Sequence, residues 1–204
     1  MKKNFLKKIL SVLLSIMITV FICASIGIFI MCNINKNENT IIKKNFGSLM
    51  SEVLNNSEVY GLYNVDFTNI EILNEVIIND VESEKRKPSN VVNLPVIVNG
   101  EIELVFTISK TFCNYNVSLG KDFAPLLSEM KKNDLNEIYI IQDNYTFYAV
   151  SGNYIYKQVG QTVTQIDEQE LNFSIQEDMQ ISKLNSVNND YTQTAIESLE
   201  AETI

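Results

Sequence analysis

Few side chains in this sequence have the type and spacing that catalysis needs. The sequence contains no histidine, which removes Ser-His-Asp and Cys-His catalysis and the usual zinc sites. Cys113 is the one cysteine beyond the N-terminal apolar run, so it has neither a histidine base nor an intramolecular disulfide partner. Glu101 and Glu103 lie two residues apart on an expected strand, and paired carboxylates can hydrolyse glycosides. We interpret this pair as a solvated strand edge, and we expect no catalytic, cofactor-binding or metal-binding site.

Five tyrosines form the candidate surface for binding a partner. They lie in a segment that we expect to be a β-meander, with strands at 137–142, 145–151, 154–159 and 161–166. The joins Asp143-Asn144 and Gly152-Asn153 are prone to tight turns, so neighbouring strands should be antiparallel. A stripe of aromatic side chains suits a binding face, and the alternative is edge packing with the hydroxyl groups in water. The five residues are Tyr139, Tyr145, Tyr148, Tyr154 and Tyr156.

A β-hairpin is the strongest local signal and precedes the meander. Val91–Val98 and Glu101–Ile108 flank Asn99-Gly100, and Asn-Gly supplies the two positive-φ residues of a type I′ turn. In the second strand, apolar residues alternate with Glu101, Glu103, Val105 and Thr107. This alternation predicts one core face, made of Ile102, Leu104, Phe106 and Ile108, and one wetter face.

Two helices are expected beside these strands. Apolar residues recur every three to four positions over 40–55, as on one face of a helix. A shorter helix should run from Phe123 to about Lys132, with Asp122 as its N-terminal cap. Residues 60–82 look extended, and a helix at 69–78 is the alternative for part of that segment.

The first 32 residues predict a membrane anchor. Four lysines precede the run Ile9–Cys32, which has no charged residue and exceeds the length of about 20 apolar residues that a helix needs to cross a bilayer. The lysines favour a cytoplasmic location for residues 1–8 and an extracellular location for the rest of the chain. Cleavage near Ala24 is the alternative, although the run is longer than that of a usual signal peptide. We therefore expect residues 9–32 to be a transmembrane signal-anchor whose partner is the lipid bilayer.

Beyond this run the chain is acidic. All 25 Asp and Glu residues follow position 32, and the whole chain has a net charge of −9. Such a surface repels nucleic acid, so no nucleic-acid partner is expected. Residues 167–204 are especially acidic and polar, and we predict that they form a partly mobile tail. The abundance of Asn, Ile and Lys and the absence of Trp are typical of a Gram-positive-type bacterium of low genomic GC content.

Three segments give the chain a resemblance to a known family. These are Pro95-Val96-Ile97-Val98-Asn99-Gly100, then Ser118-Leu119-Gly120-Lys121-Asp122-Phe123-Ala124, then Tyr148-Ala149-Val150-Ser151-Gly152. Their hairpin, helix and meander order resembles the half-barrel prosegment of staphopain-like, papain-type cysteine peptidases. The resemblance covers roughly residues 90–160 and implies a stand-alone inhibitor of an exported cysteine peptidase. No catalytic residue is carried over.

Together these patterns predict an α+β protein. A transmembrane helix at 9–32 should be followed by an antiparallel β-rich domain at 33–166, with a hairpin, a short helix and a meander, and then by the acidic tail. The expected function is that of a membrane-anchored, extracellular, non-enzymatic binding domain. The alternative is the prosegment-like inhibitor.

Overall fold

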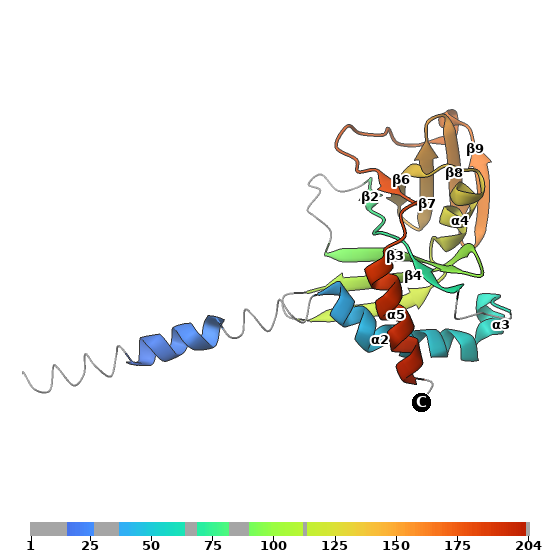
Figure 1. The fold of residues 1–204 in the computed structure, drawn as a ribbon. Helices are drawn as coiled ribbons and strands as arrows, with labels where there is room; N and C mark the ends of the chain where they lie inside the picture. The colour runs from blue at the N-terminus through green and yellow to red at the C-terminus, as the bar shows by residue number, and fades with distance from the viewer. Residues whose placement is uncertain (1–15, 27–36, 64–68, 82–89, 112–113, 203–204) are drawn as a thin grey trace, which may run out of the picture.

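The computed structural model describes residues 16–26, 37–63, 69–81, 90–111 and 114–202 and has an α+β fold (Figure 1). The helices after the N-terminal segment are α2 (Glu38–Asn55), α3 (Ser57–Tyr60), α4 (Ala124–Lys132) and α5 (Asn189–Glu202), with a 3-10 turn η2 (Glu168–Glu170). The strands are β1 (Glu71–Ile72), β2 (Ile78–Asp80), β3 (Val91–Val98), β4 (Glu101–Lys110), β5 (Tyr115–Gly120), β6 (Glu137–Asp143), β7 (Thr146–Ser151), β8 (Tyr154–Val159), β9 (Thr162–Ile166) and β10 (Ser182–Lys183).

The predicted hairpin is confirmed and forms the centre of the first sheet. Asn99 and Gly100 have φ angles of 53° and 87°, as a type I′ turn requires. The sheet has the order β1-β3-β4-β5. Strand β4 pairs antiparallel with β3 and with β5.

A shift in the β3–β4 register changes which hairpin residues share a face. Val96 pairs with Leu104, whereas Ile97 pairs with Ile102, so Glu103 has no partner on β3. An extra residue of this kind reverses the alternation of side chains. Ile102 therefore joins Val105 in a second hydrophobic cluster, away from Leu104, Phe106 and Ile108. The prediction of one core face and one wetter face is wrong, because both faces of the hairpin are covered.

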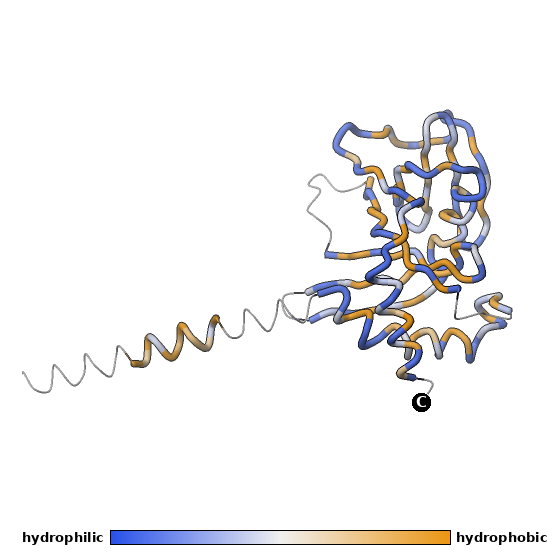
Figure 2. The backbone as a smooth tube through the Cα atoms, in the orientation of Figure 1, coloured by the Kyte–Doolittle hydropathy of each residue, from blue (hydrophilic) through white to orange (hydrophobic). Residues whose placement is uncertain are grey.

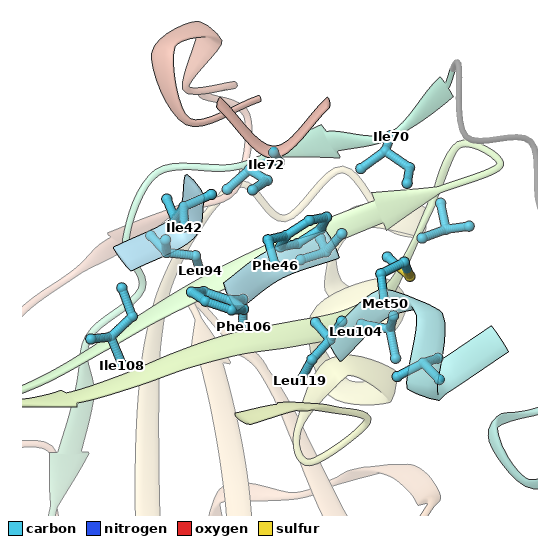
Figure 3. Close-up of a cluster of buried hydrophobic side chains, with 14 of the residues drawn as sticks. Ile42, Phe46, Met50, Ile70, Ile72, Leu94, Leu104, Phe106, Ile108 and Leu119 are labelled. Atoms are coloured by element: carbon cyan, nitrogen blue, oxygen red, sulfur yellow. The ribbon is translucent and has the colours of Figure 1, made fainter. Parts of the chain in front are cut away.

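The helix predicted at 40–55 is confirmed as α2, which covers one face of this sheet. The side chains of Phe46 and Phe106 meet with ring centroids 5.6 Å apart. Figure 3 shows α2 residues Ile42, Phe46 and Met50 packed over apolar residues of β3, β4 and β5. The buried apolar area drives this docking, because it is removed from water on folding.

The predicted meander is confirmed as β6, β7, β8 and β9, paired antiparallel in that order. β10 also pairs antiparallel with β6, at its first residues. β2 pairs with the later residues of β6 and is parallel to it. The expectation of an antiparallel sheet is therefore incomplete, because the segment 78–80 reaches β6 from a distant part of the chain. Residues 69–78 contain β1 and isolated bridges in place of the alternative helix.

Residues of the predicted tail belong to the fold, which corrects the domain boundary drawn at 166. Met179 and Leu184 are buried, and α5 packs against α2. The side chain of Thr192 accepts a hydrogen bond from the backbone N–H of Ile72 in β1 (2.9 Å), which ties α5 to the first sheet. Figure 1 shows α5, in red, beside the early helix α2.

The contact between α2 and α5 is unusually close at Gly47. Its backbone N–H donates to the hydroxyl of Ser198 at 2.9 Å. A Cβ added to Gly47 would lie 2.3 Å from the carbonyl oxygen of Ser198. The hydroxyl of Thr194 donates to the side chain of Asn39, and Glu197 forms an ion pair with Lys43. These contacts show that the two helices lie side by side and run in the same direction. Glycine at position 47 is therefore required by packing, although it weakens the helix locally.

The described part of the predicted anchor is residues 16–26, which are helical. Their apolar side chains are exposed, with Met17 70% and Phe21 74% accessible, and Figure 2 shows the hydrophobic colouring of this segment. Within the described residues, no helix has both the length and the hydropathy that crossing a membrane demands. The remainder of the predicted span 9–32 lies outside the described residues.

Candidate functional site

The five tyrosines of the candidate surface do not share one face of the meander. Tyr148 pairs with Lys157 across β7 and β8, whereas the next residue, Ala149, pairs with Tyr156. Neighbouring residues on a strand point to opposite faces, so Tyr148 and Tyr156 are buried in different hydrophobic clusters. Tyr139 lies on the same side as Tyr148. Tyr145 lies between β6 and β7 and is 95% exposed, and Tyr154, at the start of β8, is 51% exposed.

Residues 167–181 cover the outer face of the meander as a strap. Leu171, Phe173 and Met179 pack against the cluster that contains Tyr148. The rings of Tyr148 and Phe173 meet edge to face, with centroids 5.1 Å apart. Burial and the nearby Asp143 carboxylate raise the pKa of Tyr148, so its hydroxyl stays protonated near neutral pH. This tyrosine is therefore part of the packing beneath the strap.

The strap is held at both ends by polar contacts. At its start, Asp167 and Glu170 form a reciprocal capping box around η2. Near its end, the buried Asn79 side chain donates to the carbonyl oxygens of Ile140 and Gln180 and accepts from the N–H of Gln180. Asn79 thus joins the strap to β6.

Glu101 and Glu103 each meet a lysine. The carboxylate of Glu101 lies 2.9 Å from Nζ of Lys132, and that of Glu103 lies 3.3 Å from Nζ of Lys121. The hydrogen bond that the Lys132 ammonium group donates to Glu101 raises the pKa of Lys132. A pair of carboxylates suits acid–base catalysis when their environments push their pKa values apart, whereas each of these is matched by its own ammonium group. The arrangement resembles a charged rim more than a glycosidase centre.

These two ion pairs border a groove of about 400 Å³. Its walls come from α4, from the hairpin strand β4 and from the start of β9. The lining residues are Glu101, Ile102, Glu103, Lys121, Pro125, Ser128, Glu129, Lys132, Gln161 and Val163. The lining is mostly polar or charged, with Ile102, Pro125 and Val163 as its apolar part, so the groove suits a single polar side chain better than an apolar small molecule.

Gln158 fixes the helix that forms one wall of this groove. Its side chain is buried on β8 and accepts a hydrogen bond from the N–H of Leu126 in the first turn of α4, at 3.1 Å. It also donates to the carbonyl oxygens of Asp122 and Gly160, each at 2.6 Å. The sequence predicted a cap from Asp122, but the residue before α4 is Phe123 and it makes no side-chain cap. Gln158, on strand β8, supplies the acceptor that a capping side chain would otherwise provide.

The groove adjoins an open sheet edge. β9 is the last strand of the second sheet in the described structure and pairs only with β8. In Figure 1, β9 lies at the outer side of the meander, beside α4. Val163 and Gln165 pair with Gln158 and Tyr156, so their side chains lie on the α4 side of the sheet.

Two other recesses lie elsewhere in the described structure. One of about 700 Å³ lies among β1, the turn at Asn99-Gly100 and α5. Another of about 510 Å³ lies under the strap, between Ile155 and Phe173. The first recess also adjoins a terminal strand, β1, but there Thr192 of α5 binds the N–H of Ile72. The groove instead lies beside the open edge of β9. Cys113 lies outside the described residues, and among those described no cluster of three or more metal-ligating side chains occurs.

Comparisons of the chain with protein-family models, with curated proteins and with solved structures found no match. The candidate site therefore rests on its own geometry: an open strand edge, an adjoining groove and a buried glutamine that holds one wall in place. Sequence reasoning missed Gln158 because a polar residue on a meander strand is ordinarily solvent-facing. The one available signal is its position two residues after Tyr156, on the same face of the predicted strand at 154–159.

Proposed function

We propose that this chain is a single-pass, membrane-anchored binding protein of a Gram-positive-type bacterium. Residues 1–8 lie in the cytoplasm, residues 9–32 span the membrane, and the α+β domain binds a partner outside the cell without catalysing a reaction. The main support for the anchor is the helix at 16–26, whose large apolar side chains are each more than half exposed. Such a surface is costly in water and favourable in lipid.

Orientation follows from the distribution of charge around the apolar run. Lys2, Lys3, Lys7 and Lys8 precede it, whereas only Lys36 follows closely. Basic residues next to a membrane segment are retained on the cytoplasmic side. The acidic remainder of the chain then faces outward, and its charge disfavours the binding of anionic polymers.

Protease added to intact protoplasts should reduce the full chain to a fragment of about the size of the anchor. An N-terminal tag on the cytoplasmic side should survive, and a C-terminal tag should be lost. Replacing the four N-terminal lysines by glutamine should decrease the outward fraction, whereas replacing Lys36, Lys43 and Lys44 should leave it unchanged. Protection of the C-terminal tag in intact protoplasts would reverse the model.

A binding role without catalysis is supported by the polar groups of the site. Glu101 and Glu103 are both engaged by lysines, and the sequence offers no histidine to act as a base at neutral pH. The open edge of β9 and the adjoining groove, by contrast, offer main-chain groups and a recess of the kind that recognises peptides.

The second candidate function is inhibition of an exported, papain-type cysteine peptidase. The same open edge favours it, because a peptidase segment can pair with an unpaired strand. The resemblance of residues 90–160 to peptidase prosegments supports the same partner.

Titration of the detergent-solubilised full chain against such a peptidase from the same organism should slow hydrolysis of a fluorogenic peptide. Gln165→Lys on β9 should weaken inhibition, whereas Val59→Lys on α3, at a site 84% exposed, should not. An absence of inhibition at tens of micromolar chain excludes this candidate and leaves the binding role intact.

A further inference from the structure

The edge of β9 lacks the features that usually protect an open strand. Natural sheet edges carry charged residues, prolines or bulges, or are covered by another element. β9 has the sequence Thr162-Val163-Thr164-Gln165-Ile166, without charge or proline, and its pairing with β8 is regular. The edge strand of the first sheet, β1, differs from β9, because the N–H of Ile72 in β1 donates a hydrogen bond to the side chain of Thr192 in α5. The main-chain groups on the outer edge of β9 are therefore available to another strand.

The groove lies where the side chains of such a strand would reach. Val163 is half-buried against the cluster beneath α4 and also lines the groove. A strand added beside β9 would place every second side chain on the same side as Val163 and Gln165. Those side chains would lie over the outer surface of α4, where Pro125, Ser128, Glu129 and Lys132 form the groove wall.

Negative charge surrounds the uncharged strand at both ends. Three carboxylates and two ammonium groups line the groove, which leaves it with an excess of one negative charge. Beyond the other end of β9, Asp167, Glu168 and Glu170 follow within a few residues. An added segment that carries lysine or arginine would match both ends, whereas an acidic segment would be repelled.

We propose that β9 and the adjoining groove bind an extended, basic peptide segment of a partner protein by strand addition. This inference rests on the proposed binding function and names its site and the chemistry of its ligand. An antiparallel segment would place its C-terminal half over the groove, since the groove is lined by Gln161, just before β9, and by Val163, near the start of β9. Its N-terminal half would lie beside Asp167 and Glu168. Main-chain hydrogen bonds would supply affinity, and the groove would select a side chain.

The test uses the full chain in detergent micelles and a fluorescent nine-residue peptide that alternates valine and lysine. Binding is measured by fluorescence anisotropy, and the site by NMR shifts of the amides at 162–166. A peptide of the same sequence with alternate amides N-methylated cannot form all the main-chain hydrogen bonds to β9. Its affinity should be lower by a factor of about ten or more, which corresponds to a loss of about 1.4 kcal/mol in binding free energy. A peptide of valine and glutamate should not bind.

Charge variants of one residue separate strand recognition from general attraction. Gln165→Lys should decrease affinity for the basic peptide and Gln165→Glu should increase it, each several-fold. Val59→Lys adds the same charge on α3, which contributes no residue to β9 or to the lining of the groove, and should leave affinity within twofold of the unmodified chain. Added salt should weaken binding without abolishing the effect of N-methylation, because the main-chain bonds do not depend on charge.

Three results would overturn the proposal. Equal binding of the N-methylated peptide would mean that only charge attracts it. Equal effects of Gln165→Lys and Val59→Lys would place the peptide elsewhere. A dimer of the unmodified chain that Gln165→Lys dissociates would assign the edge to a second copy. None of these results changes the outcome of the protease test, which concerns the orientation of the anchor. Conversely, if the protease test fails but the peptide binds at β9, the binding site stands and only the proposed location is wrong.

Discussion

Replacing Gln158 by leucine should lower the free energy of unfolding by about 3 kcal/mol. The leucine side chain has a similar size but leaves the buried N–H of Leu126 without its acceptor, and one unsatisfied buried group costs about 1–3 kcal/mol. The carbonyl oxygens of Asp122 and Gly160 also lose their donor. These losses add to a weakened start of α4, because the helix has no side-chain cap of its own.

The measurement is urea unfolding of the full chain in detergent micelles, followed by circular dichroism because the chain has no tryptophan. Gln165→Leu is the matched control, since Gln165 lies on the neighbouring strand with an exposed side chain. We expect the control to change stability by no more than about 0.5 kcal/mol. Gln158→Leu should also weaken binding of the basic peptide, because α4 forms the groove wall. If both variants unfold at the same urea concentration, Gln158 does not hold the helix.

Replacing Gly47 by alanine should also destabilise the chain, although alanine is the better helix former. The change in helix propensity favours alanine by about 1 kcal/mol. Against it, the new methyl group would overlap the backbone carbonyl of Ser198, and overpacking costs about 1–3 kcal/mol, or more where backbone must move. We expect a net loss of about 2 kcal/mol and a weakened contact between α2 and α5.

Ser48→Ala is the control for Gly47→Ala, because Ser48 is the next residue of α2 and is exposed. It should stabilise the chain slightly or leave it unchanged. Hydrogen exchange of the α5 amides locates the effect, and these amides should exchange faster in Gly47→Ala than in the control. A gain in stability for both variants would show that the two helices separate without cost.

Elements with local patterns were predictable from the sequence. The hairpin follows from Asn99-Gly100, α2 from its apolar spacing, and the meander from its short turn-prone joins. Each of these signals depends on residues close in sequence, which fix backbone geometry before distant contacts form. The groove was not predictable, because α4, β4 and β9 come together only in the folded chain.

The features that escaped prediction have specific causes. The single unpaired residue Glu103 reverses side-chain alternation, and nothing in the local sequence marks its position. The helix α5 buries small residues, Ala195 and Ser198, against Gly47, so close backbone packing replaces the large apolar face by which helices are recognised. Without a large apolar face, the acidic composition of α5 led to the prediction of a partly mobile tail. The parallel pairing of β2 with β6 joins segments about sixty residues apart, which local periodicity cannot reveal.

The pairing of α2 with α5 has a consequence for the order in which the core is completed. α2 is synthesised well before α5, and Tyr191 and Leu199 of α5 pack against the cluster around Phe46. A chain whose synthesis stops before α5 would leave that cluster partly uncovered, and uncovered apolar segments are prone to proteolysis and aggregation. Burial of this cluster therefore waits until α5 has been translated, long after α2.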